Sequence, residues 1–492
     1  MAFRLNREPK LTPKHAAFDY QRDAVEELKG LDYGAIFHEQ GLGKTKIAID
    51  LMLSWLETDQ IDSVVIVVKK SLLTNWKNEL AAHTHMLAQQ IGQKKSANFF
   101  AFNSPARLYL THYEAVKTEL QRFKLLSKTR RLGFILDEAQ KIKNPDATLT
   151  KAFHELSPHL TRRAILTGTP ISNRPYDIWS LIFFLDQGEH LGENFAEFKK
   201  TLDLTAELGR DESAKSAFEG ELSEVFNRIS SFCVRETKNG GRIDLPEKRQ
   251  ESIITDWESR QNEMYEQVRD ELRVVVVKDG IPTEDRSDDL LKRLLRLVQI
   301  ASNPSIIDDN YHAEPGKLRY LNNLLADAFS RNEKAIVWTS FIANAKWLSA
   351  QLSEHKPAIV HGQLDMPRRD REISAFISDP DVKVLIATPG AAKEGLTLTV
   401  ANHVIFYDRT FSLDDYLQAQ DRIHRISQTK RCHVYNLLMR ESIDEWVDVL
   451  IKTKELAARL GQGDIGLDEY QALVKYDFHD ILRNILGFQE DE

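Results

Sequence analysis

The chain contains very little cysteine, and no sequence pattern is built on it. Cys233 and Cys432 are the 2 cysteines among 492 residues, and neither belongs to a CxxC pair or to a Cys/His pattern. A disulfide scaffold and a zinc site are therefore not supported, and a reducing compartment fits best. The N-terminus lacks an apolar core of signal-peptide length, and the longest apolar runs, such as Val64 to Val68, have strand length. We therefore expect a cytoplasmic protein without a membrane span.

An excess of positive charge is also missing, since the net charge is −8. This total does not favour a nucleic-acid partner, but binding needs only a local basic groove. Basic residues do cluster at Lys69-Lys70, at Lys128 to Arg131 and at Arg368 to Arg371. Such clusters are more often solvated faces than phosphate contacts, so charge alone leaves the partner open. The sequence also has no low-complexity tract and no short-period repeat.

Short apolar runs alternate with amphipathic helical segments from Phe18 to about Asp186. This alternation is typical of a doubly wound parallel sheet with helices on both faces. The expected strands are Ala35 to Phe37, Ser63 to Val68, Asn98 to Phe102, Ala106 to Leu110, Phe134 to Asp137, and Arg163 to Leu166.

The character of the sequence changes after this first α/β region. Residues 188–304 are charged and predict helices, and Thr237 to Pro246 resembles an exposed connector because it contains Gly240-Gly241 and Pro246. Strand–helix alternation then resumes, which predicts a second α/β region. We expect four parts: a first lobe over residues 1–187, helical insertions over 188–304, a second lobe over 305–442 and a helical tail over 443–492.

The segment FHEQGLGKT, from Phe37 to Thr45, is typical of a nucleotide-binding loop. An apolar strand precedes it and a helix follows it, so backbone N–H groups at Gly41, Gly43 and the helix start would face phosphate oxygens. Lys44 would reach the β- and γ-phosphates of ATP, and the Thr45 hydroxyl would coordinate Mg²⁺. The complete phosphate-loop pattern has a glycine where this chain has His38. Alone, the loop also fits an ordinary strand–turn–helix.

A second segment, GFILDEAQKIKN, supplies the carboxylates that such a site needs. Its apolar strand ends at Asp137 and Glu138, and ligands of open α/β sheets bind at the carboxyl ends of strands. Asp137 would hold Mg²⁺ through water, and Glu138 would orient the attacking water. The two segments together, in this order, favour a nucleoside-triphosphate site over a chance match.

The second α/β region carries its own signature, YLQAQDRIHRISQ, from Tyr416 to Gln428. Arg422 and Arg425 are spaced so that a helix would present both on one face. After the strand and glycine-containing turn of Ile386 to Asp408, this helix would lie at a cleft between the two lobes. Arginines delivered from one lobe to a phosphate site on the other would act as arginine fingers.

These segments occur in an order that resembles the Swi/Snf family of DNA-translocating ATPases in helicase superfamily two. The pair Asn75-Trp76 and the ending DRIHRISQ distinguish this family from strand-separating relatives. The matching segments are Phe18 to Val25, His38 to Thr45, Val67 to Leu80, Tyr109 to Val116, Leu136 to Asn144, Leu166 to Leu185, Cys233 to Lys248, Gln299 to Pro304, Ile336 to Phe341, His361 to Phe376, Ile386 to Asp408, and Tyr416 to Gln428.

The resemblance implies two RecA-like lobes and a role for each matched residue. Gln21 would read adenine, and Thr167 and Thr169 would couple hydrolysis to the DNA strand. Gly395 would lie at the lobe interface, where Gln418, Arg422 and Arg425 would complete the ATP site. The implied DNA contacts are Lys70, Thr111, Thr388 and Phe411.

The chain departs from the family pattern at a few positions. Gln140 replaces the histidine of the Asp-Glu-X-His box, and Phe411 stands where many members have tryptophan. Ala391 and Ala392 replace a common glycine pair before Gly395. None of these changes removes a catalytic group, so they bear on DNA engagement rather than on ATP hydrolysis.

The resemblance implies an ATPase that uses ATP and Mg²⁺, acts as a monomer and moves along duplex or branched DNA without extensive strand separation. We expect a bacterial or viral setting, with roles such as DNA repair, branch migration or displacement of bound protein. A strand-separating helicase and the motor subunit of a restriction or defence system stay open as alternatives. A nucleotide-gated switch with little turnover is disfavoured, because Glu138, Arg422 and Arg425 are all present.

Overall fold

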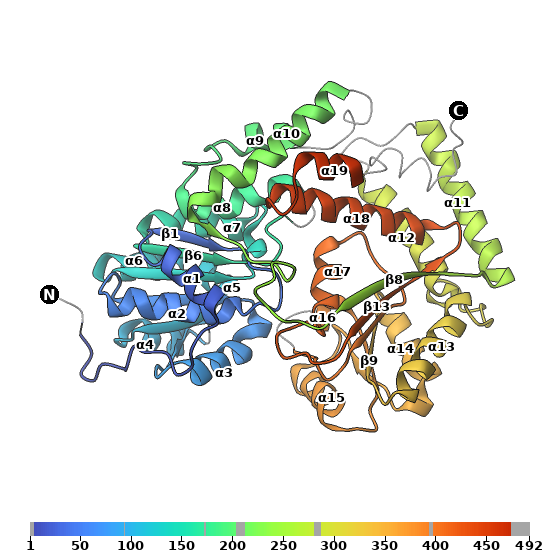
Figure 1. The fold of residues 1–492 in the computed structure, drawn as a ribbon, viewed down its shortest axis with the longest axis horizontal. Helices are drawn as coiled ribbons and strands as arrows, with labels where there is room; N and C mark the ends of the chain where they lie inside the picture. The colour runs from blue at the N-terminus through green and yellow to red at the C-terminus, as the bar shows by residue number, and fades with distance from the viewer. Residues whose placement is uncertain are drawn as a thin grey trace. The chain divides into compact units, whose positions relative to one another are not determined.

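The computed structural model of this chain describes residues 4–92, 94–171, 174–202, 212–279, 287–392 and 397–473. The chain divides into two compact units. The first comprises Met1–Asp203, Ser216–Ile243 and Ala457–Glu469, and the second comprises Leu204–Lys215, Asp244–Leu456 and Tyr470–Glu492. Figure 1 shows the elements of each unit, and each unit is an α/β fold.

The first unit contains a 7-stranded sheet in the order β3-β4-β2-β5-β6-β1-β7, and all of its pairings are parallel. Because parallel strands share a direction, their carboxyl ends lie at one edge, where the loops that follow them gather. The strands are β1 (Tyr33–Ile36), β2 (Ser63–Val68), β3 (Gln89–Gln90), β4 (Leu108–His112), β5 (Leu132–Asp137), β6 (Arg162–Leu166) and β7 (Cys233–Val234).

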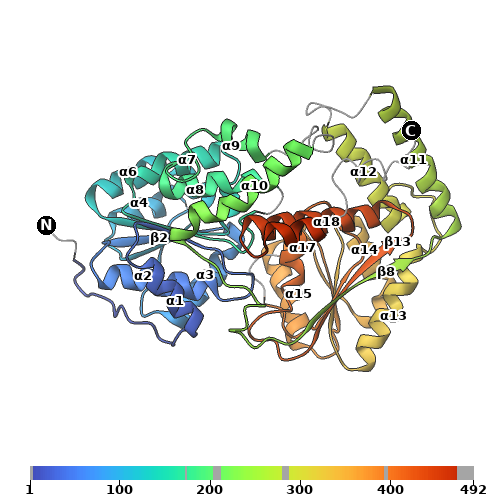
Figure 2. The same ribbon diagram turned by 45° about the horizontal axis from the view of Figure 1, so that its top comes forward.

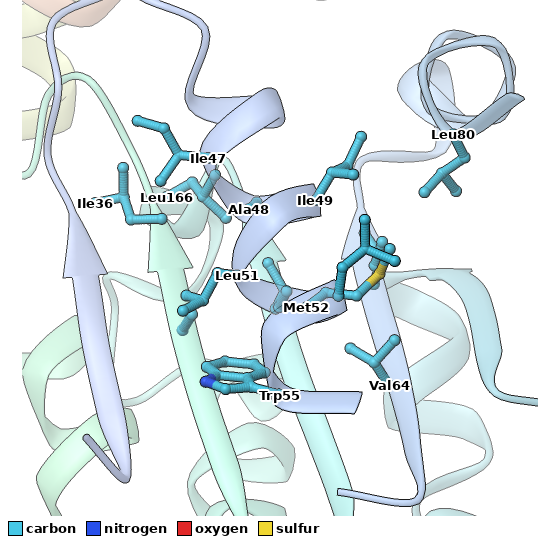
Figure 3. Packing of buried hydrophobic residues seen from close by; sticks show 14 of the residues in the cluster. Ile36, Ile47, Ala48, Ile49, Leu51, Met52, Trp55, Val64, Leu80 and Leu166 are labelled. Carbon is cyan, nitrogen blue, oxygen red and sulfur yellow. The ribbon is translucent and has the colours of Figure 1, made fainter. Parts of the chain in front are cut away.

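Helices cover both faces of this sheet, with α2 on one face and α7 and α8 on the other (Figure 2). The apolar residues of α2 pack onto Ile36, Val64 and Leu166 of the strands, and Leu80 of α3 closes the side of this core (Figure 3). The helices are α1 (Asp19–Leu28), α2 (Lys44–Glu57), α3 (Leu73–His83), α4 (Lys95–Asn103), α5 (Tyr113–Thr118), α6 (Leu120–Thr129), α7 (Thr148–Leu156), α8 (Ile178–Asp186), α9 (Phe195–Leu202) and α10 (Glu212–Ile229).

One expected strand of the first unit is wrong. Asn98 to Phe102 lies within the helix α4. Asn98 and Ala101 are buried, whereas Phe99 and Phe100 between them are exposed. Burial at positions three apart is the helical period, whereas a short apolar run had suggested a strand. The Asn98 side chain also accepts a 3.0 Å hydrogen bond from the Gly92 backbone N–H and thereby ties the helix to the preceding loop.

The second unit contains a 6-stranded parallel sheet in the order β10-β11-β9-β12-β13-β8. The strands are β8 (Lys248–Thr255), β9 (Ala335–Trp338), β10 (Ala358–Val360), β11 (Val384–Ala387), β12 (His403–Phe406) and β13 (Cys432–Met439). The helices are α11 (Ser259–Asp279), α12 (Ser287–Ser302), α13 (Gly316–Ser330), α14 (Ile342–Gln351), α15 (Met366–Ser378), α16 (Pro389–Ala392), α17 (Leu413–Gln420), α18 (Ile443–Gly461) and α19 (Leu467–Leu473). Two RecA-like parallel-sheet units, as expected, are therefore present.

The expected helical insertion over residues 188–304 needs a correction. It does contain helices, but it also supplies one edge strand to each sheet. β7 pairs with β1 in the first unit, and β8 pairs with β13 in the second unit along its whole length. The chain passes from the first unit to the second at Ile243 and Asp244, within the predicted connector. Both strands were missed because β7 is short and β8 begins with the polar run KRQES.

The tail expected over residues 443–492 is helical where the structure describes it. α18 begins in the second unit, but Ala457–Glu469 belongs to the first unit. There Asp464 accepts a bidentate ion pair from Arg235, which follows β7. Residues beyond Leu473 lie outside the described part of the chain. Among the described helices, none has the length and apolar character that crossing a bilayer requires.

Candidate ATP-binding site

The loop between β1 and α2 has the backbone geometry of a phosphate cradle. Gly41 and Gly43 both have positive φ angles, of 86° and 71°, which glycine adopts at low cost. A Cβ atom on Gly43 would overlap the amide nitrogen of Gln21, so this position also lacks room for a side chain. α2 begins at Lys44, and no side chain caps its first turn. Its N-terminal backbone groups therefore suit an anionic ligand.

Lys44 is held across this loop. Its Nζ atom donates hydrogen bonds to the carbonyl oxygens of His38 (2.9 Å) and Glu39 (3.2 Å). The ammonium group therefore lies over the concave side of the loop, where phosphate oxygens would be recognised. Thr45 follows in the first turn of α2 and is partly exposed. Both residues therefore lie at the start of α2, beside the glycine-containing loop.

His38, which replaces the first glycine of the usual pattern, is a buried wall of the loop. Its side chain is 2% exposed, and its Nδ1 atom lies 3.4 Å from the carbonyl oxygen of Val234 in β7. Burial, with the positive charge of Lys44 as the next cause, lowers the pKa of His38 to about 3. The imidazole is therefore neutral at physiological pH and adds no charge beside Lys44.

Asp137 and Glu138 lie at the carboxyl end of β5, at the same sheet edge as the phosphate loop. Burial and the neighbouring Glu138 carboxylate raise the pKa of Asp137, whereas the Trp76 hydrogen bond and the charge of Lys44 oppose that rise. Glu138 has a φ angle of 55°, a left-handed conformation that is costly for glutamate. Backbone strain of this kind often accompanies function.

Neutral N–H groups hold both carboxylates. Trp76 of α3 donates a 2.7 Å hydrogen bond from Nε1 to Oδ2 of Asp137. Gln140, the residue in place of the family histidine, donates a hydrogen bond to Oε2 of Glu138. The Tyr113 hydroxyl fixes the backbone by donating a 2.7 Å hydrogen bond to the carbonyl oxygen of Asp137. Gln140 therefore gives the Glu138 carboxylate a hydrogen-bond partner.

Gln21 lies beside the phosphate loop. Its Nε2 atom donates to the Leu42 carbonyl oxygen (3.3 Å), and its Oε1 atom accepts from the backbone N–H of Phe18 (3.1 Å). The start of α1 also lines a pocket of about 400 Å³ formed by Phe18, Asp19, Tyr20 and Arg242. An aromatic surface and a guanidinium next to an amide are suited to a planar base.

Sequence reasoning missed Arg242 and Phe18 as pocket residues. Arg242 follows Gly240-Gly241 in the connector and forms ion pairs with Asp23 and Glu236, the second at 3.6 Å. The sequence indicated an exposed connector, but it did not show that the connector lies beside α1, because that contact is made by tertiary structure. Phe18 is 55% exposed despite its apolar side chain. An exposed apolar side chain at the edge of a pocket indicates a binding surface, and this exposure is visible only in the structure.

The hydroxyl and amide groups after β6 adjoin the loop as well. Thr167 and Thr169 are both buried, and the Thr167 hydroxyl accepts a 3.2 Å hydrogen bond from the Thr169 backbone N–H. A Cβ atom on Gly168 would lie 2.8 Å from the side-chain nitrogen of Gln40 in the phosphate loop. The segment after β6 therefore packs closely against the loop.

In the second unit, the expectation of one helix bearing both arginines is wrong. α17 ends at Gln420, and residues 421–427 form turns. The Gln428 side chain holds these turns by donating to the carbonyl oxygens of Ala401 and Ile423, both at 2.9 Å. His424 contacts the Pro246 carbonyl oxygen at 2.9 Å. These tertiary hydrogen bonds replace the helical ones that the spacing had suggested.

The two arginines consequently have different surroundings. Arg422 is buried, and its Nε atom donates to the Gln418 carbonyl oxygen at 3.0 Å. Arg425 is partly exposed, donating to the Asp421 carbonyl oxygen (3.2 Å) and to the Thr397 hydroxyl (2.9 Å). Gln418 is also buried and donates to Asp414 at 2.7 Å. Gly395 lies outside the described residues.

The predicted DNA contacts differ in accessibility. Lys70 is exposed at the start of a short 3₁₀ helix after β2, and Phe411 is partly exposed with its carbonyl oxygen held by Lys454 at 2.7 Å. Thr111 and Thr388 are buried, at the ends of β4 and β11. Lys70 and Phe411 are therefore accessible to a ligand in this structure, and the two threonines are not.

A buried carboxylate organises the neighbouring loops of the second unit. Asp408 is 3% exposed and accepts hydrogen bonds from the side chains of Ser302 (2.8 Å), Thr339 (2.6 Å) and Asn344 (3.1 Å). It also accepts from the Ser340 backbone N–H at 2.7 Å. This network joins the end of α12, the end of β9 and the first turns of α14 around one side chain.

Comparison with known proteins identifies the family of this chain. The family model for the SNF2-related domain matches residues 20–306, and the model for the helicase conserved C-terminal domain matches residues 316–427. The first match covers more than half of the chain. The protein therefore belongs to the SNF2-related family, with a helicase-type C-terminal unit.

Individual relatives are longer than this chain. An ATP-dependent helicase of Mycoplasma genitalium is 28% identical over 443 residues, which is 87% of this chain and 40% of that protein. The Bacillus subtilis helicase/translocase YwqA is 29% identical over 445 residues, 87% of this chain and 46% of that protein. The chain thus spans less than half of the length of either. A solved structure, the Sulfolobus solfataricus SWI2/SNF2 ATPase core in complex with dsDNA, is 26% identical, with 98% and 99% of the chains covered and a TM-score of 0.43.

Proposed function

We propose that this protein is a DNA-dependent ATPase that moves along duplex or branched DNA and remodels it without extensive strand separation. The observation that carries the proposal is the assembly in the first unit, where Lys44 lies across a glycine-rich loop and Asp137 and Glu138 lie at the same sheet edge. Membership in the SNF2-related family and the names of the relatives support DNA as the partner.

The first unit fits ATP and Mg²⁺ on the chemistry of its donors. Lys44 and the uncapped start of α2 would bind phosphate oxygens, and the pocket beside Gln21 would accept the base. Thr45 and Asp137 would hold Mg²⁺, a hard cation that prefers oxygen ligands and keeps several waters. Mg²⁺ would neutralise charge on the phosphates during transfer.

The side chains around the phosphates would then carry the reaction. Glu138, oriented by Gln140, would position the attacking water and accept its proton. Arg425 of the second unit would stabilise charge on the transferred phosphoryl group, so that turnover needs both units.

DNA would be held through its backbone. Lys70 is exposed after β2, and α15 of the second unit presents the basic residues Arg368 and Arg371 on its surface. Contacts to phosphates carry no sequence information, so binding should be sequence-independent and sensitive to salt. The net charge of −8 makes such local basic patches the relevant feature.

The test compares ATP hydrolysis with matched single-stranded, duplex and branched DNA over a range of salt concentrations. We expect duplex or branched DNA to stimulate more than single strands and the stimulation to fall steeply with salt. The protein should displace a third strand from a triplex. The Glu138→Gln variant should bind ATP but should neither hydrolyse it nor displace the strand. Efficient unwinding of a blunt duplex, with single strands as the best activator, would instead support a strand-separating helicase.

A further inference from the structure

The indole of Trp76 joins the hydrophobic core of the first unit to the carboxylate of Asp137, which is proposed to hold Mg²⁺. Trp76 lies on α3 and is 1% exposed, so its ring is enclosed by the core. Its single polar atom, Nε1, donates a 2.7 Å hydrogen bond to Oδ2 of Asp137. A bond of this length to a carboxylate is a strong charge-assisted one.

The core itself does not explain this bond. Trp55 of α2 belongs to the same cluster and is also 1% exposed, and Figure 3 shows its ring against the strands. The Nε1 atom of Trp55 has no hydrogen-bond partner. The core of the first unit therefore tolerates a tryptophan whose N–H is unused. The hydrogen bond from the Trp76 N–H to Asp137 is therefore a separate feature, which packing of the core does not require.

We propose that Trp76 is a positioning residue that orients Asp137 for Mg²⁺. This inference rests on the proposed ATPase function. The indole holds Oδ2 and Tyr113 holds the backbone carbonyl, so both the side chain and the backbone of Asp137 have a hydrogen-bond partner. Asp137 would hold Mg²⁺ through water, and a partner that orients the carboxylate would orient that water as well, which affects metal affinity. Because the indole is neutral, it orients the carboxylate without adding a positive charge beside the cation.

The experiment compares Trp76→Phe with Trp55→Phe in the full chain. Each change keeps an aromatic ring in the same core and removes one N–H group, but only the first removes a donor from Asp137. The binding of a fluorescent ATP analogue is measured over a range of free Mg²⁺ concentrations and, separately, in EDTA. Melting temperatures of both variants report whether the fold is retained.

We expect Trp76→Phe to raise the Mg²⁺ concentration for half-maximal enhancement of binding by about 10-fold or more, the usual effect of losing such a partner. Affinity in EDTA should stay at the wild-type value, and Trp55→Phe should leave the Mg²⁺ dependence unchanged. Equal Mg²⁺ dependence in the two variants would overturn the role of Trp76. A wild-type chain without Mg²⁺-dependent nucleotide binding would overturn the proposed function, and this inference with it.

A second measurement covers the case in which Trp76→Phe does not fold. Mn²⁺ and ADP are added to the wild-type chain labelled with ¹⁵N-tryptophan, and the indole N–H signals are recorded. One signal should broaden before the others, and it should persist in Trp55→Phe, because the paramagnetic ion would lie beside Asp137. Uniform broadening, or none, would overturn the proposal.

Discussion

Replacing Gly43 with alanine tests the geometry of the phosphate loop directly. The φ angle of 71° puts this residue in the left-handed region, where alanine costs about 1–2 kcal/mol more than glycine. The new methyl group would also overlap the Gln21 amide. Gln21 would have to move and would lose its bonds to the Leu42 carbonyl and the Phe18 N–H. At about 0.5–1.5 kcal/mol for each bond, we expect a total loss of about 2–5 kcal/mol.

The chain offers a matched control in Gly241→Ala. Gly241 has a φ angle of 75°, and no atom lies within 4 Å of the position of an added Cβ. Substitution of Gly241 should therefore lower the free energy of unfolding only through the strained backbone conformation, by about 1–2 kcal/mol. The difference between the two variants isolates the collision with Gln21.

The assay is urea denaturation of both variants, followed by calorimetry to resolve the transition of the first unit, together with ATP affinity. In the double variant Gly43→Ala/Gln21→Ala the two losses should be less than additive, because the collision partner is gone. ATP affinity should fall in Gly43→Ala and stay unchanged in Gly241→Ala. Equal destabilisation by the two single substitutions would refute the overlap argument.

Three further outcomes follow. Arg425→Ala should lower kcat by about a thousandfold with ATP affinity retained, as for other arginine fingers, and normal kcat would remove Arg425 from the reaction. The pKa of His38 is about 3 in the folded chain and near 6.5 in the unfolded chain. Its contribution to the free energy of unfolding is therefore complete above pH 6.5. That effect should be lost at about 1.4 kcal/mol per pH unit as the pH falls toward 3, a slope absent in His38→Asn when unfolding free energies are compared. Asp408→Asn should destabilise the second unit by about 2–4 kcal/mol in calorimetry, whereas exposed Asp370→Asn should change it by less than about 0.5 kcal/mol.

Structure could be predicted from the sequence where residues of one short segment determine both the sequence pattern and the local structure. Val64 to Val68 is continuously apolar because β2 is covered on both faces, and this was readable directly. The phosphate loop was readable because its glycines and Lys44 serve the backbone geometry of one short segment. The carboxylates were readable since Asp137 ends an apolar strand.

Prediction failed where a partner distant in sequence decides the structure. The turns after Gln420 are held by Gln428 and by the Pro246 carbonyl, and no local spacing shows such partners. β8 was missed because an edge strand needs few apolar residues. The contact of Trp76 with Asp137 was likewise invisible, although Asn75-Trp76 had been noted as a family signature.

The position of β8 has a consequence for the order in which the protein is made. β8 is the first strand of its sheet in sequence, but its neighbour among the described strands is β13, the last. At typical synthesis rates of about 5–20 residues per second, β8 leaves the ribosome roughly ten to forty seconds before its neighbour exists. During that interval its backbone groups are open to other chains. Its polar beginning, Lys248 to Glu251, carries charged residues of the kind that oppose pairing of an edge strand with other chains.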